Sequence, residues 1–216
     1  IAIIGTGFSG LGMAIKLKEA GFNNFVILEQ SDDIGGTWHE NHYPGCACDV
    51  QSALYSFSFE QNPNWTRMFA PQPEIKAYLR HCAEKYGLLE HIQLNTHVAG
   101  ARWNERTGAW AIETCDSPKL WAYMEANNLK PGDVLDRSDK TLPRFRKLHA
   151  EVLVSGMGGL STPAYPDIKG MDTFTGTSFH SQNWDHDYDF RGKRVAVIGT
   201  GASAIQFVPE IAKDAA

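Results

Sequence analysis

The sequence predicts an α/β fold in which two similar strand–turn–helix units follow one another. Two glycine-rich turns carry this prediction, GTGFSG at residues 5–10 and GTGASA at residues 199–204. Each turn follows an apolar stretch typical of a buried strand and precedes a run with helical spacing. This order is typical of dinucleotide-binding, Rossmann-like units, in which the turn lies against a pyrophosphate. The sequence therefore predicts two nucleotide sites rather than one.

The composition of the chain indicates a globular protein that acts on small molecules. Of its 216 residues, 43% are hydrophobic and 21% are charged, with a formal net charge of −5 and no polybasic block. Nucleic acid and anionic membranes are therefore poor candidates as partners. No apolar run approaches the roughly 20 residues of a membrane span, and the N-terminus has no signal-peptide pattern. We expect a cytoplasmic protein, and the sequence indicates no oligomeric state.

The first unit begins with a strand at residues 1–4 and continues with a helix at residues 13–21, which Gly21 ends. A second strand follows at residues 25–30. The next segment, residues 31–49, is rich in glycine and other turn-forming residues. We expect it to be a long loop, and long loops in compact domains are often functional.

An amphipathic helix and a small antiparallel sheet come next. Residues 73–86 have the spacing of a helix whose apolar face carries Ile75, Tyr78, Leu79 and Cys82. Residues 91–105 and 108–114 alternate between apolar and polar side chains, which predicts two strands joined at Thr107 and Gly108. Residues 149–156 predict one further, apolar strand. The sheet is expected to be inserted in the first nucleotide unit.

A polar insertion occupies about residues 116–148. Ser117 suits the N-cap and Pro118 the first position of a helix, which Pro131 and Gly132 are expected to end. Because surface loops tolerate insertions, we expect a surface excursion rather than a lid or a partner surface.

The cysteines do not indicate a metal site or a disulfide. No CxxC pair and no paired spacing with histidine occur among them. We expect reduced thiols, buried or in loops, at Cys46, Cys48, Cys82 and Cys115.

The first glycine turn has the context of a real dinucleotide site. Gly5 permits the tight bend, Gly7 lets the backbone approach a pyrophosphate, and Gly10 lets the helix pack on the strand. Glu29 ends the second strand, where its carboxylate can accept both ribose hydroxyls. Its charge would repel a ribose 2′-phosphate, which favours FAD or NAD over NADP at this site.

The turn-rich segment at residues 32–49, DDIGGTWHENHYPGCACD, favours FAD. It supplies glycines for close backbone approach, one large aromatic side chain and a terminal carboxylate. The cofactor-binding residues expected here are Gly36, Thr37, Trp38 and Asp49.

Two longer motifs make the chain resemble the flavin-dependent Baeyer–Villiger monooxygenases, within the class B flavoprotein monooxygenases. The pattern FxGxxxHxxxW, followed by Pro or Asp, is met by Phe174, Gly176, His180, Trp184 and Asp185. The pattern GGxWxxxxYPGxxxD is met by Gly35, Gly36, Trp38, Tyr43, Pro44, Gly45 and Asp49. The two nucleotide turns lie in the family's order around them, so the resemblance covers nearly the whole chain.

The resemblance implies FAD at the first unit and NADP at the second. The second turn would contribute Gly199, Gly201, Ser203 and Ala204. Ala204 replaces the third glycine, a departure that such turns tolerate because this position mainly limits helix–strand packing.

The resemblance also implies roles for three further residues. Asp49 matches the active-site carboxylate that lies near the flavin and influences a catalytic arginine, and we expect that arginine beyond Ala216. His180 and Trp184 match fingerprint residues that are ascribed to interdomain signalling. Hydrogen bonding within the linker is the alternative role for His180, and packing of the linker is the alternative for Trp184.

The activity implied by the resemblance is the oxidation of ketones to esters or lactones. NADPH would reduce the flavin, the reduced flavin would capture O2, and the resulting peroxyflavin would attack the ketone carbonyl. The chain begins inside a strand without Met and stops inside a helix. We therefore expect an N-terminal fragment, inactive by itself, with an FAD-binding domain at 1–168, a linker with the fingerprint at 169–192, and the start of an NADP-binding domain at 193–216.

Three other functions are alternatives. Flavin monooxygenases that oxygenate nitrogen or sulfur usually carry Tyr or Phe at the position of Trp184 and lack the following Asp. A pyridine nucleotide–disulfide reductase would need a CxxxxC pair, which Cys46 and Cys48 do not supply. A non-catalytic flavin-binding fragment is the alternative from outside the enzymes.

Overall fold

The computed structural model describes residues 1–160 and 162–216. The chain forms two compact units, each built from two separate segments. Unit 1 comprises residues 1–34 and 82–157, and unit 2 comprises residues 35–81 and 158–216. This division differs from the domain boundaries expected at residues 168 and 192, which stay a prediction.

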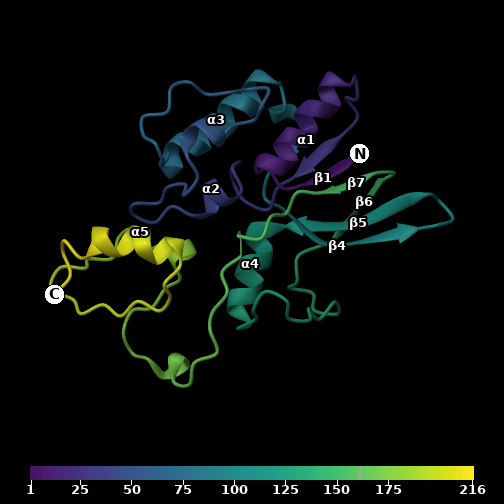
Figure 1. Cartoon of the computed structure of the whole chain (residues 1–216). Helices are drawn as coiled ribbons and strands as arrows, with labels where there is room; N and C mark the ends of the chain where they lie inside the picture. Colours follow the sequence, from purple (N-terminus) through teal and green to yellow (C-terminus); the bar gives the residue numbers. More distant parts are fainter. Residues whose placement is uncertain (161) are drawn as a thin grey trace. The chain divides into compact units, whose positions relative to one another are not determined.

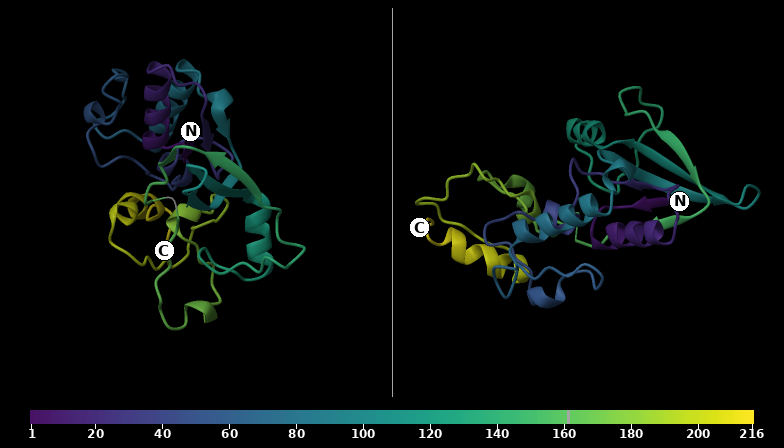
Figure 2. Two further views of the ribbon diagram at one scale, coloured as in Figure 1. Left: turned by 90° about the vertical axis from the view of Figure 1, so that its right-hand side faces the viewer. Right: turned by 90° about the horizontal axis from the view of Figure 1, so that it is seen from above.

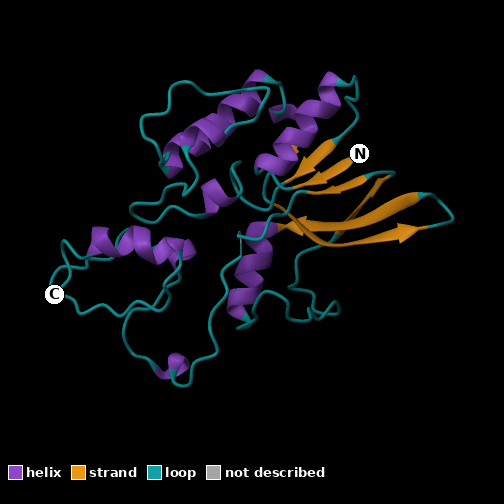
Figure 3. Cartoon of the chain, in the orientation of Figure 1, coloured by secondary structure: helices purple, strands orange, loops and turns teal. Residues whose placement is uncertain are grey.

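Unit 1 contains a four-stranded parallel sheet with the strand order β3-β2-β1-β7 (Figures 1 and 3). Ile3 of the central strand pairs with Ile27 on one side and with Val154 on the other. Helix α1 connects the parallel strands β1 and β2. The bounds are β1 (Ala2–Ile4), α1 (Phe8–Glu19), β2 (Val26–Leu28), β3 (Ile92–Gln93) and β7 (Leu153–Ser155).

A three-stranded antiparallel sheet of unit 1 has the order β4-β5-β6. Its strands are β4 (Thr96–Asn104), β5 (Ala109–Asp116) and β6 (Arg146–Ala150). The turn between β4 and β5 contains Thr107 and Gly108, as predicted, and this hairpin extends away from the parallel sheet in Figures 1 and 2. The two sheets share one apolar core, whose buried members are Ala2, Leu28, Ile112 and Ala150.

Two predicted strands are wrong because each divides between the two sheets. Residues 91–105 contain β3 of the parallel sheet and then β4, and the positive φ of 54° at Asn95 breaks the run between them. Residues 149–156 likewise contain the end of β6 and the whole of β7. Both halves are apolar on the core side, so periodicity does not reveal the change of sheet.

The insertion forms a helix, α4 (Ser117–Ala126), that starts and ends earlier than predicted. Its N-cap is Asp116, whose carboxylate accepts from the Lys119 amide at 3.0 Å, so the expected N-cap at Ser117 is wrong by one residue. The helix ends well before Pro131, where Asn128 takes a φ of 53°. The start of the helix is therefore set by the carboxylate of Asp116, which makes the capping hydrogen bond.

The insertion is more than a surface excursion. A cluster of buried residues, Cys115, Leu120 and Met124, forms between α4 and β5. Apolar side chains from the rest of the insertion pack against it, namely Tyr123, Leu129, Leu135, Leu142 and Phe145. The last residues of the predicted insertion already belong to β6.

Unit 2 is mostly irregular chain with short helices. Inside the predicted loop at residues 31–49 the structure has one helical turn, α2, so that segment is not irregular throughout. The predicted amphipathic helix is confirmed, with Ile75, Tyr78, Leu79 and Cys82 all buried. The helices are α2 (Thr37–Glu40), α3 (Gln72–Lys85, which runs on into unit 1 after His81) and α5 (Ala202–Ile211). Short 3₁₀ turns of unit 2 lie at Ser52–Leu54, Met171–Thr173 and Ser181–Asn183, and one of unit 1 lies at Leu89–His91.

The strand expected before the second glycine turn does not form. Residues 193–200 have no strand assignment, and Val195, Val197 and Ile198 are exposed. A strand needs neighbours to satisfy its backbone groups, and the described residues place none beside this segment.

The first glycine turn packs backbone against backbone at the carboxyl ends of β1 and β7. A Cβ atom on Gly10 would lie 1.9 Å from the carbonyl oxygen of Gly5, and one on Gly156 would lie 2.8 Å from the carbonyl oxygen of Ile4. Gly5 itself has a φ of 92°. Because the chain leaves β1 toward β2 on one side and has β7 on the other, these glycines lie where ligands bind in open α/β sheets.

We predict that Gly10→Ala destabilises the chain by about 3 kcal/mol or more, because the clash is with backbone atoms that cannot rotate away. Gly100→Ala is the matched control, since no atom lies within 4 Å of its Cβ position. It should change the free energy of unfolding by less than about 0.5 kcal/mol. Urea unfolding followed by circular dichroism measures both, and similar midpoints for the two variants would contradict the packing argument.

Candidate functional site

The first glycine turn of unit 1 leaves β1 and opens α1. The Gly5 amide donates to the Leu28 carbonyl at 2.8 Å, which fixes the turn on β2. Gly7 is the N-cap of α1 with extended backbone angles and no side-chain cap, and no acidic residue follows in the first turn. A helix end of this kind suits an anion.

Glu29 lies against this turn, and it is buried with 6% of its surface exposed. Its carboxylate accepts from the Thr6 amide at 2.8 Å, the Thr6 hydroxyl at 2.6 Å and the Ser31 amide at 3.0 Å. A carboxylate has about four acceptor positions. Glu29 therefore ties the turn to the end of β2, a structural role that the sequence does not reveal, and its contact with a ribose stays a prediction.

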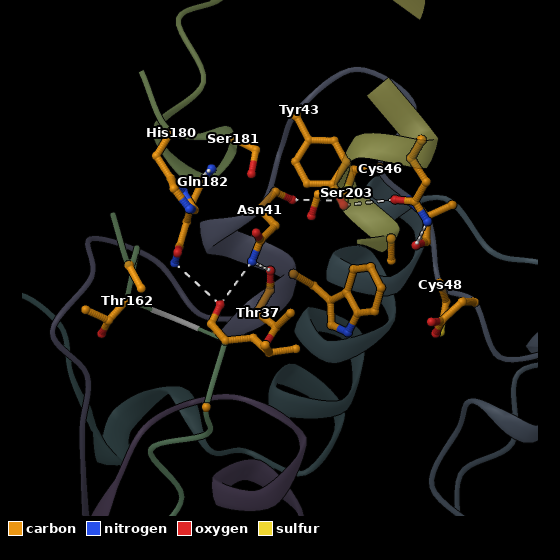
Figure 4. Close-up of a pocket in the computed structure, with 18 of the residues that line it drawn as sticks. Thr37, Asn41, Tyr43, Cys46, Cys48, Thr162, His180, Ser181, Gln182 and Ser203 are labelled. Atoms are coloured by element: carbon orange, nitrogen blue, oxygen red, sulfur yellow. Dashed lines mark hydrogen bonds between the residues drawn. The ribbon is translucent and has the colours of Figure 1, made fainter. Parts of the chain in front are cut away.

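A cavity of about 470 Å³ lies within unit 2 (Figure 4). Five of the predicted site residues line it: Thr37, Trp38, Asp49, His180 and Ser203. They come from residues 35–49, called the YPG motif segment below, from the fingerprint at residues 174–185, and from the second glycine turn. Motifs far apart in the sequence thus meet at one cavity.

Helix α2 presents two of these side chains. Its N-cap is Gly36, where a φ of 53° starts the turn. Trp38 is buried, and its indole nitrogen donates to the Tyr55 hydroxyl at 3.1 Å. Burial raises the pKa of Tyr55, so the hydroxyl stays protonated. Tyr55 also lines the cavity, and no sequence motif marks it.

A shared acceptor connects the YPG motif segment to the fingerprint. The Leu160 carbonyl accepts from Asn41 Nδ2 at 3.2 Å and from Gln182 Nε2 at 3.4 Å. Figure 4 shows Asn41 and Gln182 directed toward this point. His180 caps the 3₁₀ turn at Ser181–Asn183, because its Nδ1 accepts from the Gln182 amide at 3.1 Å.

Electrostatics favour the neutral form of His180. Burial lowers its pKa below the ordinary 6.5. Because Nδ1 accepts a hydrogen bond, the ring proton of the neutral form lies on Nε2. His180 is therefore a hydrogen-bond donor on a side chain that lines the cavity.

Asp49 is an exposed cavity residue at the end of the YPG motif segment. Within the described part of the chain its carboxylate has no hydrogen bond or ion pair. The two neighbouring cysteines, Cys46 and Cys48, are buried free thiols whose pKa burial raises. All four cysteines are free and buried, which agrees with the expected reduced thiols.

Trp184 does not line the cavity. It is 7% exposed and contacts an aromatic cluster formed by Phe179, Phe190 and Phe207. This position agrees with the expected packing of the linker, whereas a catalytic part for Trp184 stays a prediction.

The second glycine turn opens α5. Gly199 has a φ of 122°, and Gly201 is the N-cap without a side-chain cap. Ser203 and Ala204 lie in the first turn of α5, which contains no acidic residue. The turn therefore has the form predicted for it, even without the strand before it.

Tyr43 and Gln206 are two of the cavity residues that were not predicted as site residues, and they contact each other. Burial is the main cause that raises the pKa of Tyr43 to about 12. The Tyr43 hydroxyl donates to Gln206 Oε1 at 2.9 Å. Gln206 stands three residues after Ser203, and this helical spacing is the one signal that could have indicated it.

The described residues contain no group of three or more His, Cys, Asp or Glu side chains arranged to hold a metal ion. None of the described helices has the length and apolar character needed to cross a bilayer. The cytoplasmic location expected from the sequence stays a prediction.

Two family models match separate parts of the chain. The NAD(P)-binding Rossmann-like domain matches residues 3–71, and the flavin-binding monooxygenase-like family matches residues 148–216. Among curated proteins, a Baeyer–Villiger monooxygenase of Pseudomonas aeruginosa is 55% identical over 98% of this chain and 35% of its own length. A Baeyer–Villiger monooxygenase of Streptomyces coelicolor is 46% identical over the same shares.

Solved structures agree with the sequence matches. A polycyclic ketone monooxygenase of Thermothelomyces thermophila matches 99% of this chain and 33% of its own, with a TM-score of 0.82 and 31% identity. A steroid monooxygenase bound to NADP matches 99% of this chain and 36% of its own, with a TM-score of 0.76 and 36% identity. The chain is therefore similar to flavin-binding monooxygenases of the Baeyer–Villiger type over nearly all of its residues, and it spans about one third of the length of the relatives that it matches.

Proposed function

We propose that this chain supplies the FAD site and the first part of the NADP site of a monooxygenase that converts ketones to esters or lactones with NADPH and O2. One observation carries the proposal. Thr37 and Asp49 of the YPG motif segment, His180 of the fingerprint and Ser203 of the second glycine turn line a single cavity. A reaction that uses two nucleotides needs such a meeting point.

The residues of unit 1 fit the adenine dinucleotide part of FAD. The close packing of Gly5, Gly10 and Gly156 leaves no room for side chains where the backbone must approach a pyrophosphate. The N-terminus of α1 adds amide donors without a side-chain cap. Glu29 supplies negative charge beside the turn, which suits ribose hydroxyls and disfavours a 2′-phosphate.

The residues of α5 fit a second dinucleotide. Its N-terminus lacks a side-chain cap and acidic residues, so it can accept phosphate charge. Solved relatives are described as bound to NADP, or to FAD and NADP. When bound, these groups supply hydride transfer to the flavin and activation of dioxygen.

The cavity residues would bind and orient the reacting groups, and they would exclude water. Trp38 is held by Tyr55 and gives the cavity an apolar wall. Neutral His180 offers an Nε2–H donor, and Asp49 offers an unpaired carboxylate that can hold a cationic partner in place. Preorganised groups of this kind stabilise charge that develops during a reaction.

The function is tested with the chain in its native polypeptide. We expect a yellow, flavin-containing protein that oxidises NADPH in the presence of O2 and does so faster when a cyclic or aryl ketone is added. The products should be esters or lactones, identified by mass spectrometry. Oxygenated amines or sulfides in their place would support the heteroatom-oxygenating alternative, and a protein that binds flavin but oxidises nothing would support the non-catalytic one.

We predict that Asp49→Asn lowers kcat for ketone oxygenation by on the order of 100-fold, because it removes the charge from the cavity. The FAD content should stay unchanged, since Asp49 is exposed and its carboxylate has no hydrogen bond or ion pair among the described residues. Asp187→Asn is the control, because Asp187 is an exposed carboxylate that does not line the cavity. Loss of bound FAD in folded Asp49→Asn would show a structural role instead.

We predict that His180 makes the chain less stable in acid. Its pKa is lowered in the folded state, so the unfolded state binds more protons once the pH falls through the ordinary value of 6.5. The contribution to stability is complete above that value and is lost as the pH drops toward the folded pKa. His180→Asn keeps an acceptor for the Gln182 amide but does not titrate.

Urea midpoints at about pH 7.5 and about pH 5 measure this effect. The midpoint should fall in both proteins, because other histidines with lowered pKa values, such as His42 and His97, titrate in both. It should fall further for the native chain, because only that chain contains His180. An equal fall in the two proteins would exclude His180 as the cause.

A further inference from the structure

We propose that Gln206 is a positioning residue, whose amide fixes the chain at residues 43–48 on α5 and so couples the second nucleotide turn to the position of Asp49. The proposal rests on the proposed function, because it gives Gln206 a part in that reaction. It assigns to α5 a task besides nucleotide binding.

The side-chain amide of Gln206 pairs with the backbone of Ala47. Nε2 donates to the Ala47 carbonyl at 2.8 Å, and Oε1 accepts from the Ala47 amide at 3.3 Å. Oε1 also accepts from the Tyr43 hydroxyl at 2.9 Å. The Ala47 amide and carbonyl together define which end of the Gln206 side chain is oxygen, because the reversed amide would face both groups with the wrong partner.

Helix and loop also approach more closely than side chains allow. A Cβ atom on Gly45 would lie 2.8 Å from the Gln206 carbonyl oxygen, and Gly45 has a φ of 77°. The Tyr43 ring meets the ring of Phe207 edge-on with 6.0 Å between centroids. The contact therefore combines a backbone approach, a ring contact and the amide pair.

The other side of this loop is fixed independently of α5. The Cys48 amide donates to the Ala70 carbonyl at 2.9 Å, and the Gln72 amide donates to the Cys46 carbonyl at 2.9 Å. Residues 46–48 thus lie between the segment at residues 70–72 and Gln206. The next residue in the chain is Asp49.

Position on the helix makes Gln206 suitable for the coupling. Ser203 and Gln206 are three residues apart, so they are neighbours on one face of α5, and both line the cavity. A nucleotide that orders the first turn of α5 would therefore also order Ala47. From Ala47, Asp49 is two residues away.

Thiol labelling tests the contact without any cofactor. Cys46 and Cys48 are 7% and 5% exposed, so a thiol reagent reaches them only when the loop opens. We expect Gln206→Met, which keeps the size of the side chain, to raise their labelling rates by about tenfold or more. Cys82 and Cys115, buried elsewhere, report on overall unfolding and should be unchanged.

Two further variants make the labelling specific. Lys213→Met, beyond the end of α5, should label like the native chain. Tyr43→Phe removes the phenol bond but keeps both bonds to Ala47, so Cys46 and Cys48 should label within about twofold of the native rate. Faster labelling of all four thiols in Gln206→Met would mean that Gln206 only stabilises the fold. An unchanged labelling rate at every thiol would mean that the contact does not fix the loop at residues 43–48. Either result overturns the proposal.

Kinetics in the native polypeptide test whether Gln206 acts through Asp49. We expect Gln206→Met to lower kcat for ketone oxygenation by roughly 10- to 100-fold, with a smaller change in KM for the ketone. In an Asp49→Asn background the same substitution should lower kcat by less than about twofold, because a positioning residue needs the group that it positions. Independent, multiplying effects of the two substitutions would overturn the proposal.

Protection by NADP⁺ separates the two proposals. In the native protein, added NADP⁺ should slow the labelling of Cys46 and Cys48, and in Gln206→Met it should not. If the native protein shows this protection but does not oxygenate ketones, the proposed function fails and the coupling stands. If the native protein oxygenates ketones but NADP⁺ protects both proteins equally, the coupling alone fails.

Discussion

Close approach of one backbone to another is the constraint on which both units depend. In unit 1, Gly5, Gly10 and Gly156 bring the ends of β1 and β7 against the start of α1 at distances that exclude a Cβ atom. In unit 2, Gly45 brings its loop equally close to the backbone of α5. These contacts use the smallest residue where chain segments meet, so the positions of turns and helices are defined by the backbone itself.

Polar side chains fix the segments of the chain that have no regular secondary structure. Glu29 accepts three hydrogen bonds from Thr6 and Ser31, and Gln206 satisfies both backbone groups of Ala47. Buried backbone groups outside helices and sheets need such partners, since leaving them unpaired is costly. These hydrogen bonds therefore fix the irregular segments of the chain where those segments form the candidate site.

The sequence predicts local features of this fold better than the pairing of its strands. The turn at Gly5 and the helix containing Ile75 follow from motifs and spacing. The change of sheet between Ala150 and Leu153 does not, because an apolar run looks the same in either sheet. Gln206 also has no local signature, because its partner Ala47 lies far away in the sequence and contributes only backbone atoms.

Two residues of the fingerprint, His180 and Trp184, lie in different surroundings. His180 lines the cavity, whereas Trp184 lies in an aromatic cluster and contacts Phe207 of α5 with 5.0 Å between ring centroids. Phe207 also contacts Tyr43, so one ring of α5 touches both the fingerprint and the YPG motif segment. Aromatic packing of this kind transmits small displacements, because a dense cluster cannot deform at one ring alone. The two residues therefore differ in their surroundings, because Trp184 packs against α5 and His180 faces the cavity.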